Sequence, residues 1–182
     1  MNIDLDGEFL VTASRSDAYR FLTDPTRFAP LLPHFKSLDE VADDRFLMTI
    51  ELGVPQIRGT AKVEVRSVER VADQVARFKS VARQAMGVVD SDLSFELNER
   101  GADTVVHWRA TSKVRGGLAS IAGGILMPLA KRNVADMIDS VQRALGPVTA
   151  PSQEGVAQAP AKARSFVSRL ASWILALFGR RS

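Results

Sequence analysis

The chain has 182 residues, of which 46% are hydrophobic and 25% are charged, and it contains no cysteine. This composition supports one domain with a real core and excludes a disordered chain. The missing cysteine excludes disulfide frameworks, thiolate zinc sites and a cysteine nucleophile. The net charge of +3 is concentrated beyond Gly146, where five basic residues and one acid give +4. The remainder, at −1, lacks the basic face of a nucleic-acid binder.

The first segment of the chain predicts a strand followed by two short helices. Apolar residues alternate with acids from Ile3 to Val11, which indicates a strand, and neither a basic nor an apolar leader precedes it, so we expect no secretory signal. Ser14 is a suitable helix N-cap, and Asp24-Pro25 ends the first helix and begins a second, from Thr26 to Leu32.

Between residues 45 and 112, apolar and polar residues alternate in five runs separated by turn signals. The residues that share one face within each run are Phe46, Met48, Ile50 and Leu52; Ile57, Ala61, Val63 and Val65; Ala76, Phe78, Ser80 and Ala82; Val89, Ser91, Leu93, Phe95 and Leu97; and Val106, Trp108 and Ala110. Short connections between such strands are typical of antiparallel hairpins with one buried face and one solvated face.

From Arg115 to Leu145 the apolar residues recur at helical spacing, which predicts one long helix that ends at Gly146-Pro147. The predicted fold class is α+β, a helix-grip fold in which a curved antiparallel sheet of about seven strands wraps around this helix. We expect a ligand-binding domain over residues 1–146, a flexible linker rich in Ala, Pro and Gln over 147–161, and a tail helix over 162–182.

The inner face of the predicted sheet mixes large aromatic residues with many small ones. The first half of the long helix offers mainly glycine and alanine opposite them, and interior glycines weaken a helix. In a close-packed core, small residues on one element face large residues on another. Because the predicted helix offers few large residues here, one interpretation is an apolar cavity beneath a deformable helix end. The alternative is a closer approach of helix and sheet that leaves no void.

The tail predicts an amphipathic helix of 16 residues, Ala163 to Phe178, whose polar arc is narrow. At about 1.5 Å per residue it is too short to cross a bilayer core of about 30 Å, and no other stretch of the chain is apolar enough to do so. We expect it to lie in the membrane interface, although docking on a protein partner is an alternative. The expected membrane contacts are Phe166, Leu170, Trp173, Ile174, Leu177, Phe178, Arg169, Arg180 and Arg181.

The sequence offers no evident catalytic group, metal site or covalent cofactor site, so we expect a protein that is not an enzyme. His34 adjoins a proline, and His107 falls on the solvated face of its strand. Neither histidine has a carboxylate partner close by in sequence. The paired glycines of the last helix do not follow phosphate-loop or dinucleotide spacing.

Several short motifs resemble those of the START-like helix-grip superfamily (SRPBCC), which includes the birch pollen allergen (Bet v 1-like fold). They are Gly7-Glu8-Phe9, Phe21-Leu22-Thr23-Asp24-Pro25, Leu32-Pro33 and Arg58-Gly59-Thr60-Ala61. More narrowly, the hairpin Gly53 to Gly59 and the run Gly116 to Gly123 resemble the CoxG family, the G subunit of carbon monoxide dehydrogenase. Pro33-His34-Phe35 stands where members usually have Pro-Gly-Cys, so no role of that thiol transfers.

The resemblance implies a carrier of an apolar guest, a respiratory quinone, at the cytoplasmic face of the cell membrane, serving carbon monoxide dehydrogenase or a related molybdenum hydroxylase. On this hypothesis the ligand contacts from the sheet are Met48, Ile50, Phe78, Phe95 and Trp108. Those from the helix are Ile121, Gly123, Ile125 and Leu129. Leu31, Leu32 and Phe35 would form a mouth, and Ser80 and Ser91 would bond a head group.

Two other functions stay open at this point. The first is a membrane-recruitment adaptor or assembly factor with a filled core and no ligand. The second is a cyclase, hydrolase or isomerase on the same fold, which would need an acid or base in the cavity. Extraction of bound lipid separates the first from the carrier.

Overall fold

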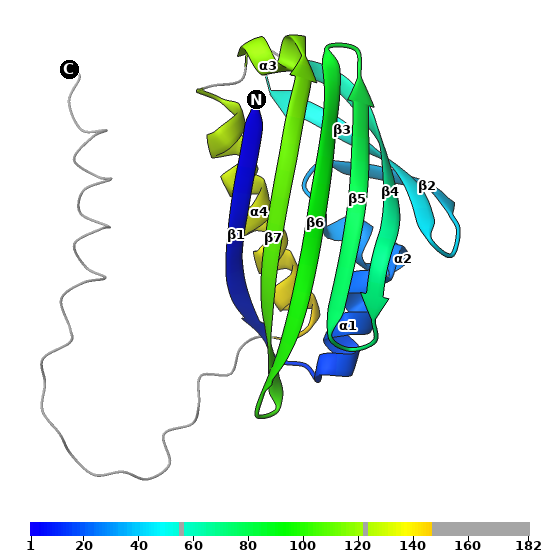
Figure 1. Cartoon of the computed structure of the whole chain (residues 1–182), viewed down its shortest axis with the longest axis vertical. Helices are drawn as coiled ribbons and strands as arrows, with labels where there is room; N and C mark the ends of the chain where they lie inside the picture. The colour runs from blue at the N-terminus through cyan, green and yellow to red at the C-terminus, as the bar shows by residue number, and fades with distance from the viewer. Residues whose placement is uncertain (55–56, 122–123, 147–182) are drawn as a thin grey trace, which may run out of the picture. The chain divides into compact units, whose positions relative to one another are not determined.

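The computed structural model describes residues 1–54, 57–121 and 124–146 of the chain (Figure 1). Its elements, in chain order, are β1 (Asn2–Val11), α1 (Arg15–Thr23), α2 (Pro25–Phe28), the 3-10 turn η1 (Ala29–Leu31), β2 (Phe35–Val41), β3 (Arg45–Val54), β4 (Ile57–Val71), β5 (Val75–Gln84), β6 (Gly87–Arg100), β7 (Asp103–Gly116), α3 (Gly117–Ile121) and α4 (Leu126–Ala144). The linker and tail predicted over 147–182 lie outside the described residues.

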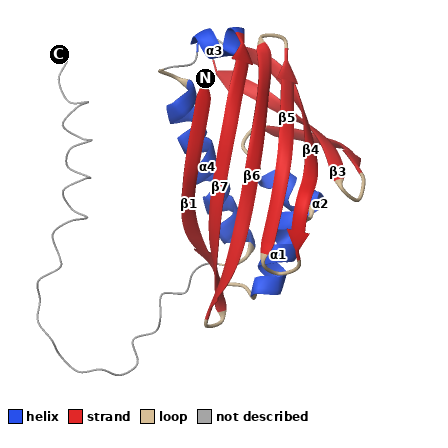
Figure 2. Ribbon diagram, in the orientation of Figure 1, coloured by secondary structure: helices blue, strands red, loops and turns tan. Residues whose placement is uncertain are grey.

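Seven strands form one antiparallel sheet in the order β1-β7-β6-β5-β4-β3-β2. The first strand, β1, pairs with the last strand, β7, and β1 and β2 are the two edges of the sheet. Figure 2 shows α4 against one face of the curved sheet, with α1 and α2 covering the same face at one end. The predicted helix-grip architecture is confirmed, with two short helices after the first strand.

The two short helices begin at capping residues read from the sequence. The Ser14 hydroxyl accepts a hydrogen bond from the Asp17 backbone N–H at 3.2 Å, as an N-cap does. The Asp24 carboxylate caps α2 in the same way through the Thr26 N–H at 2.9 Å. The second helix is shorter than predicted, because α2 ends at Phe28 and a 3-10 turn follows it.

The prediction of one long helix from Arg115 was wrong. β7 continues to Gly116, where a positive φ of +80° turns the chain into the short α3, and the long helix α4 begins only at Leu126. Of the glycines that were expected to soften a long helix, Gly116 ends β7, Gly117 begins α3 and Gly124 lies in a turn. The long helix that packs against the sheet is therefore formed by residues further along the chain than predicted.

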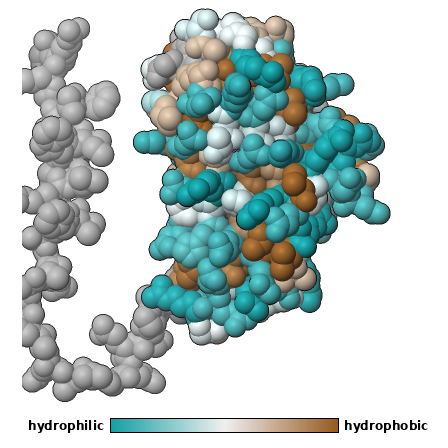
Figure 3. Space-filling view, viewed as in Figure 1, coloured by the Kyte–Doolittle hydropathy of each residue, from teal (hydrophilic) through white to brown (hydrophobic). Residues whose placement is uncertain are grey.

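The outer face of the sheet is solvated, as its alternation predicted, and Figure 3 shows it as mainly hydrophilic. Charges pair across neighbouring strands there: Lys79 lies 3.8 Å from Asp92, and Arg115 pairs with Asp90. His107 is also on this face, with its Nδ1 atom 3.3 Å from Glu8 Oε2. Such exposed pairs stabilise a fold only weakly.

The inner face forms two hydrophobic clusters. The larger cluster includes Phe9, Phe28, Phe78, Phe95 and Trp108, and α4 joins it through residues such as the fully buried Val141. The smaller cluster, defined by Ile3, Val114 and Leu118, lies beneath α3 and the start of α4. The larger cluster contains the site described next.

Candidate functional site: an apolar cavity

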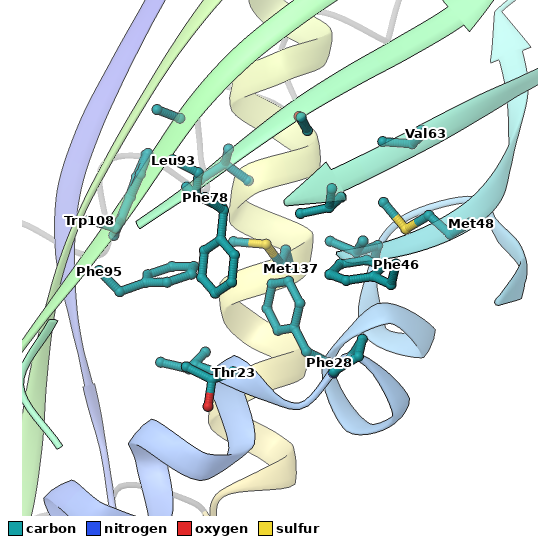
Figure 4. Close-up of a pocket in the computed structure, with 17 residues that line it drawn as sticks. Thr23, Phe28, Phe46, Met48, Val63, Phe78, Leu93, Phe95, Trp108 and Met137 are labelled. Carbon is teal, nitrogen blue, oxygen red and sulfur yellow. The ribbon is translucent and has the colours of Figure 1, made fainter. Parts of the chain in front are cut away.

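A cavity of about 210 Å³ lies inside the larger cluster, between the sheet, the short helices and α4 (Figure 4). Its lining residues are Leu22, Thr23, Pro25, Phe28, Leu32, Phe46, Met48, Val63, Val65, Phe78, Ser80, Leu93, Phe95, Trp108, Ala110, Val134 and Met137. None of these side chains is charged or titrates near neutral pH. The cavity therefore presents an apolar surface with very few polar groups, as small-molecule sites do.

Aromatic rings form the walls of the cavity without filling it. Phe95 meets Phe28 and Phe78 edge to face, with ring centroids 6.2 and 6.4 Å apart. In Figure 4 these three rings, Phe46 and Met137 surround one space, each arriving from a different element. These edge-to-face contacts fix the three rings relative to one another. The space beside them is not filled by the neighbouring side chains.

Polar atoms at the cavity are few. The Thr23 hydroxyl donates a hydrogen bond to the Tyr19 carbonyl oxygen at 2.8 Å, so its only hydrogen is already used. The Ser80 hydroxyl has no hydrogen-bond partner among the described residues, and it is half-buried on the cavity wall. Of the two lining hydroxyls, Ser80 is therefore the one better able to donate a hydrogen bond to a ligand.

Trp108 is placed by a glycine on the neighbouring strand. Gly7 pairs with Trp108 across β1 and β7, and a Cβ at Gly7 would lie 3.2 Å from the indole Nε1. A larger residue at this position would push the indole aside, which explains a glycine inside a strand. The buried indole N–H has no partner among the described residues.

The cavity adjoins the protein surface where α1 meets α2. Four lining residues, Thr23, Pro25, Phe46 and Phe78, also line a surface depression beside the β2–β3 turn. These four side chains therefore separate the cavity from the surface there. We call this part of the wall the portal.

Comparison with known families gives a match between residues 7–146 and the family described as the G subunit of carbon monoxide dehydrogenase (CoxG). The match covers the grip from the Gly7 that seats Trp108 to the end of α4. The chain belongs to the CoxG family. The sequence resemblance to this family is thereby confirmed. A comparison with curated protein sequences finds no match.

Solved structures show the same fold at low identity. A conserved protein from Geobacillus kaustophilus is 16% identical with a TM-score of 0.72, covering 79% of this chain and 95% of its own. A START superfamily protein from Mycobacterium smegmatis is 11% identical with a TM-score of 0.56, covering 78% and 96%. The protein Ara h 8.0201 is 8% identical with a TM-score of 0.60, covering 80% and 98%. At these identities the likeness concerns the fold alone.

The structure brings six of the residues predicted for ligand contact in this CoxG-family chain to the cavity. They are Leu32, Met48, Phe78, Ser80, Phe95 and Trp108. Ile50 and Phe35 instead pack against the larger cluster from the side. Leu31 also packs there and borders a separate surface cleft with His34 and Leu129.

Two of the four helical residues predicted to contact the ligand do not line this cavity. Ile125 is 37% exposed, and Leu129 faces the surface cleft rather than the cavity. The cause is the late start of α4, which places Val134 and Met137 opposite the sheet instead. The Ile121 side chain and Gly123 lie outside the described part of the structure.

Ser91, predicted to bond a head group, does not line the cavity. Its Oγ atom lies 2.8 Å from Ser112 Oγ. The lining residues that sequence reasoning missed are Leu22, Thr23, Pro25, Phe28, Phe46, Val63, Val65, Leu93, Ala110, Val134 and Met137. Most of the missed sheet residues were placed on the inner face correctly. Only their register with the neighbouring strands was unknown.

No helix among the described residues is both long and apolar enough to cross a membrane. The same part of the chain holds no group of three or more His, Cys, Asp or Glu residues that could bind a metal ion.

Proposed function

We propose that this protein carries a respiratory quinone between the cell membrane and a redox enzyme, with the quinone ring in the cavity. The observation that supports this most directly is an apolar, uncharged cavity with one available hydroxyl, Ser80. A quinone ring is flat and apolar, and its oxygens accept hydrogen bonds. Aromatic walls and a hydroxyl complement both properties.

The cavity volume fits the ring of a quinone and not its polyisoprenoid chain. Its 210 Å³ falls below the roughly 300 to 1,000 Å³ of common ligand pockets, whereas an apolar cavity of about 150 Å³ is enough for benzene. The chain of the ligand would therefore leave through the portal formed by Thr23, Pro25, Phe46 and Phe78. This arrangement suits a carrier that collects its guest from a bilayer.

Attachment to the inner face of the membrane is the second part of the proposal. The support is the composition of residues 162–182, in which an apolar helix pattern is flanked by Arg169, Arg180 and Arg181. A long-chain quinone is nearly insoluble in water, so a carrier must stay close to the bilayer. Tethering raises the local concentration of carrier without any new contact to the guest.

The partner in this proposal is carbon monoxide dehydrogenase or a related molybdenum hydroxylase, which the family description supports. The protein would act on the quinone only by binding it. The cavity has no acid, base or nucleophile of the kind that a cyclase or hydrolase needs, and neither His34 nor His107 lines it.

Ligand binding is testable because the chain has only two tryptophans, one in the cavity and one in the tail. The variant Trp173→Phe leaves Trp108 as the only tryptophan, and we expect saturable, one-to-one quenching by menadione, a chain-free quinone. The matched variant Trp108→Phe, without lipid, should show only weak, linear quenching. Equal linear quenching in both variants would mean collision with free quinone and would remove the carrier function.

Membrane attachment is tested with the complementary variant. In Trp108→Phe the remaining Trp173 should shift its emission to shorter wavelengths when phosphatidylglycerol vesicles are added. Replacing Arg180 and Arg181 by serine should weaken vesicle binding by about 30-fold, at about 1 kcal/mol per charge. Vesicle binding together with no menadione binding would favour the ligand-free adaptor.

A further inference from the structure

Three serines from adjacent strands lie side by side on the inner face of the sheet. Ser80 of β5 is the register partner of Ser91 of β6, which in turn is the partner of Ser112 of β7. All three side chains are half-buried. Two positions away from each serine, on the same face of the sheet, the residues are apolar: Phe78, Leu93 and Ala110 on one side of the row, and Ala82, Val89 and Val114 on the other. We call Ser80, Ser91 and Ser112 the serine row.

The serine row has spare hydrogen-bonding capacity at the end that lines the cavity. A serine hydroxyl has one donor and two acceptor sites. Ser91 Oγ and Ser112 Oγ lie 2.8 Å apart and share one hydrogen, so the pair keeps a second hydrogen for another acceptor. Ser80, at the cavity wall, has no partner among the described residues, and its hydroxyl can both donate and accept there.

A hydroxyl differs from the charged groups that bind oxygen atoms elsewhere. Lysine and arginine only donate hydrogen bonds and an ionised carboxylate only accepts them, whereas serine does both. A quinone carbonyl accepts a hydrogen bond. Two electrons and two protons convert the two carbonyls to hydroxyls, each of which can also donate. Ser80 can therefore bond the same ligand oxygen before and after reduction by turning its own hydrogen.

The rest of the cavity does not distinguish the two oxidation states either. The Trp108 indole N–H, unpartnered within the described part of the chain, only donates, and an oxygen of either redox form can accept from it. None of the side chains that line the cavity is charged, so neither redox form gains an ion pair, and none can take or give a proton near neutral pH. Apolar and aromatic walls contact the two nearly isosteric rings alike. The electrons and protons must then come from the partner enzyme or the solvent, because the cavity supplies neither.

We propose that the serine row, through Ser80, lets the cavity bind the quinone and the quinol form of its ligand with nearly equal affinity. This rests on the proposed quinone-carrying function and adds to it a rule of redox specificity. A carrier of this kind delivers either form without altering the driving force of the partner enzyme. A tenfold preference for one form would shift the two-electron midpoint potential of the bound ligand by about 30 mV.

The test is calorimetric titration of the full-length chain with menadione and, anaerobically, with dithionite-reduced menadiol. The two dissociation constants of the unmodified protein should agree within about threefold. Ser80→Ala should weaken the binding of both forms by roughly three- to tenfold, the loss of one hydrogen bond. Ser94→Ala is the matched control, because Ser94 follows on β6 but faces the outer side of the sheet, and it should change neither constant.

Each outcome discriminates between the two claims. A preference above tenfold for one form in the unmodified protein overturns the redox rule and leaves the carrier function standing. Unchanged affinities in Ser80→Ala, with thermal unfolding showing a folded protein, likewise remove Ser80 from the rule alone. If neither menadione nor menadiol binds the unmodified protein, the proposed function fails and the rule fails with it.

Discussion

The two ends of the grip differ in how closely their backbone elements approach one another. Near α3, backbone packs on backbone, because a Cβ on Gly116 would lie 2.9 Å from both Gly87 Cα and the Met86 carbonyl oxygen. In the larger cluster, aromatic rings meet edge to face around a cavity of about 210 Å³. None of the glycines in the described part of the chain borders that cavity.

This contrast reverses an intuitive rule. Small residues on an inner face suggest a void, but at Gly87 and Gly116 they allow strands and α3 to approach closely. Large rings suggest a filled core, but Phe28, Phe78 and Phe95 line a cavity although they contact one another. The alternative of close approach without a void, left open by the sequence, applies at the glycine-rich end, and the cavity interpretation applies at the aromatic end.

The largest expected effect comes from a substitution that fills the cavity at the aromatic end and leaves the glycine-rich end unchanged. Val134→Trp places a large ring into the cavity from α4 and should lower menadione affinity by at least about 100-fold, because the indole would occupy the space that the ligand ring needs. Ile125→Trp, on an exposed residue at the other end, is the matched control and should keep the affinity. Calorimetry measures both, with circular dichroism as the check on folding. Equal loss in the two variants would place the ligand elsewhere.

The glycine-rich end should respond in stability rather than in binding. Gly116→Ala combines a positive φ of +80° with backbone clashes, whereas Gly101→Ala has a φ of +67° and open space around the new Cβ. Both pay about 1 to 2 kcal/mol for the left-handed conformation. Gly116→Ala should lose about 1 to 3 kcal/mol more by urea unfolding because of the clashes. Identical losses would show that close approach at this end matters little.

The smallest expected effect concerns the acid stability of the aromatic end. A hydrogen bond from the Thr26 hydroxyl lowers the pKa of Asp24, the cap of α2 beside the cavity. The unfolded chain, with an ordinary aspartate pKa near 3.9, binds this proton first as the pH falls. The stabilisation is therefore full above about pH 4 and is lost as the pH falls through the lowered pKa. Asp24 is largely exposed, so the effect stays below about 1 kcal/mol.

Asp24→Asn should keep the helix cap, since asparagine caps as well as aspartate does. It should flatten the loss of stability below pH 4, measured as urea midpoints across an acid series. Curves of equal steepness for the variant and the unmodified protein would contradict this role of Asp24.

Much of the fold was predictable because it depends on local patterns. Alternation placed Phe78, Phe95 and Trp108 on the buried face, and capping chemistry located the starts of α1 and α2. The start of α4 was not predictable in this way. The run of glycine and alanine after Arg115 fits a weak helix as well as it fits a strand end and a turn.

The site was predictable only in part for the same reason. Six cavity residues came from inner-face patterns, but α4 begins 11 residues later than expected, so the helical contacts fell on Val134 and Met137. The pairing of Ser91 with Ser112 depends on strand register, which a single sequence does not determine. Thr23, Pro25 and Phe28 joined the site because the short helices fold back over the sheet.

The most direct test of the account is mass spectrometry of organic extracts from the full-length protein, purified gently from quinone-replete cells. We expect a quinone in the extract of the unmodified protein, in near-stoichiometric amount, and its loss from Val134→Trp purified in parallel. An extract without quinone, or equal quinone in both preparations, would contradict the claim that the aromatic cavity holds the ring.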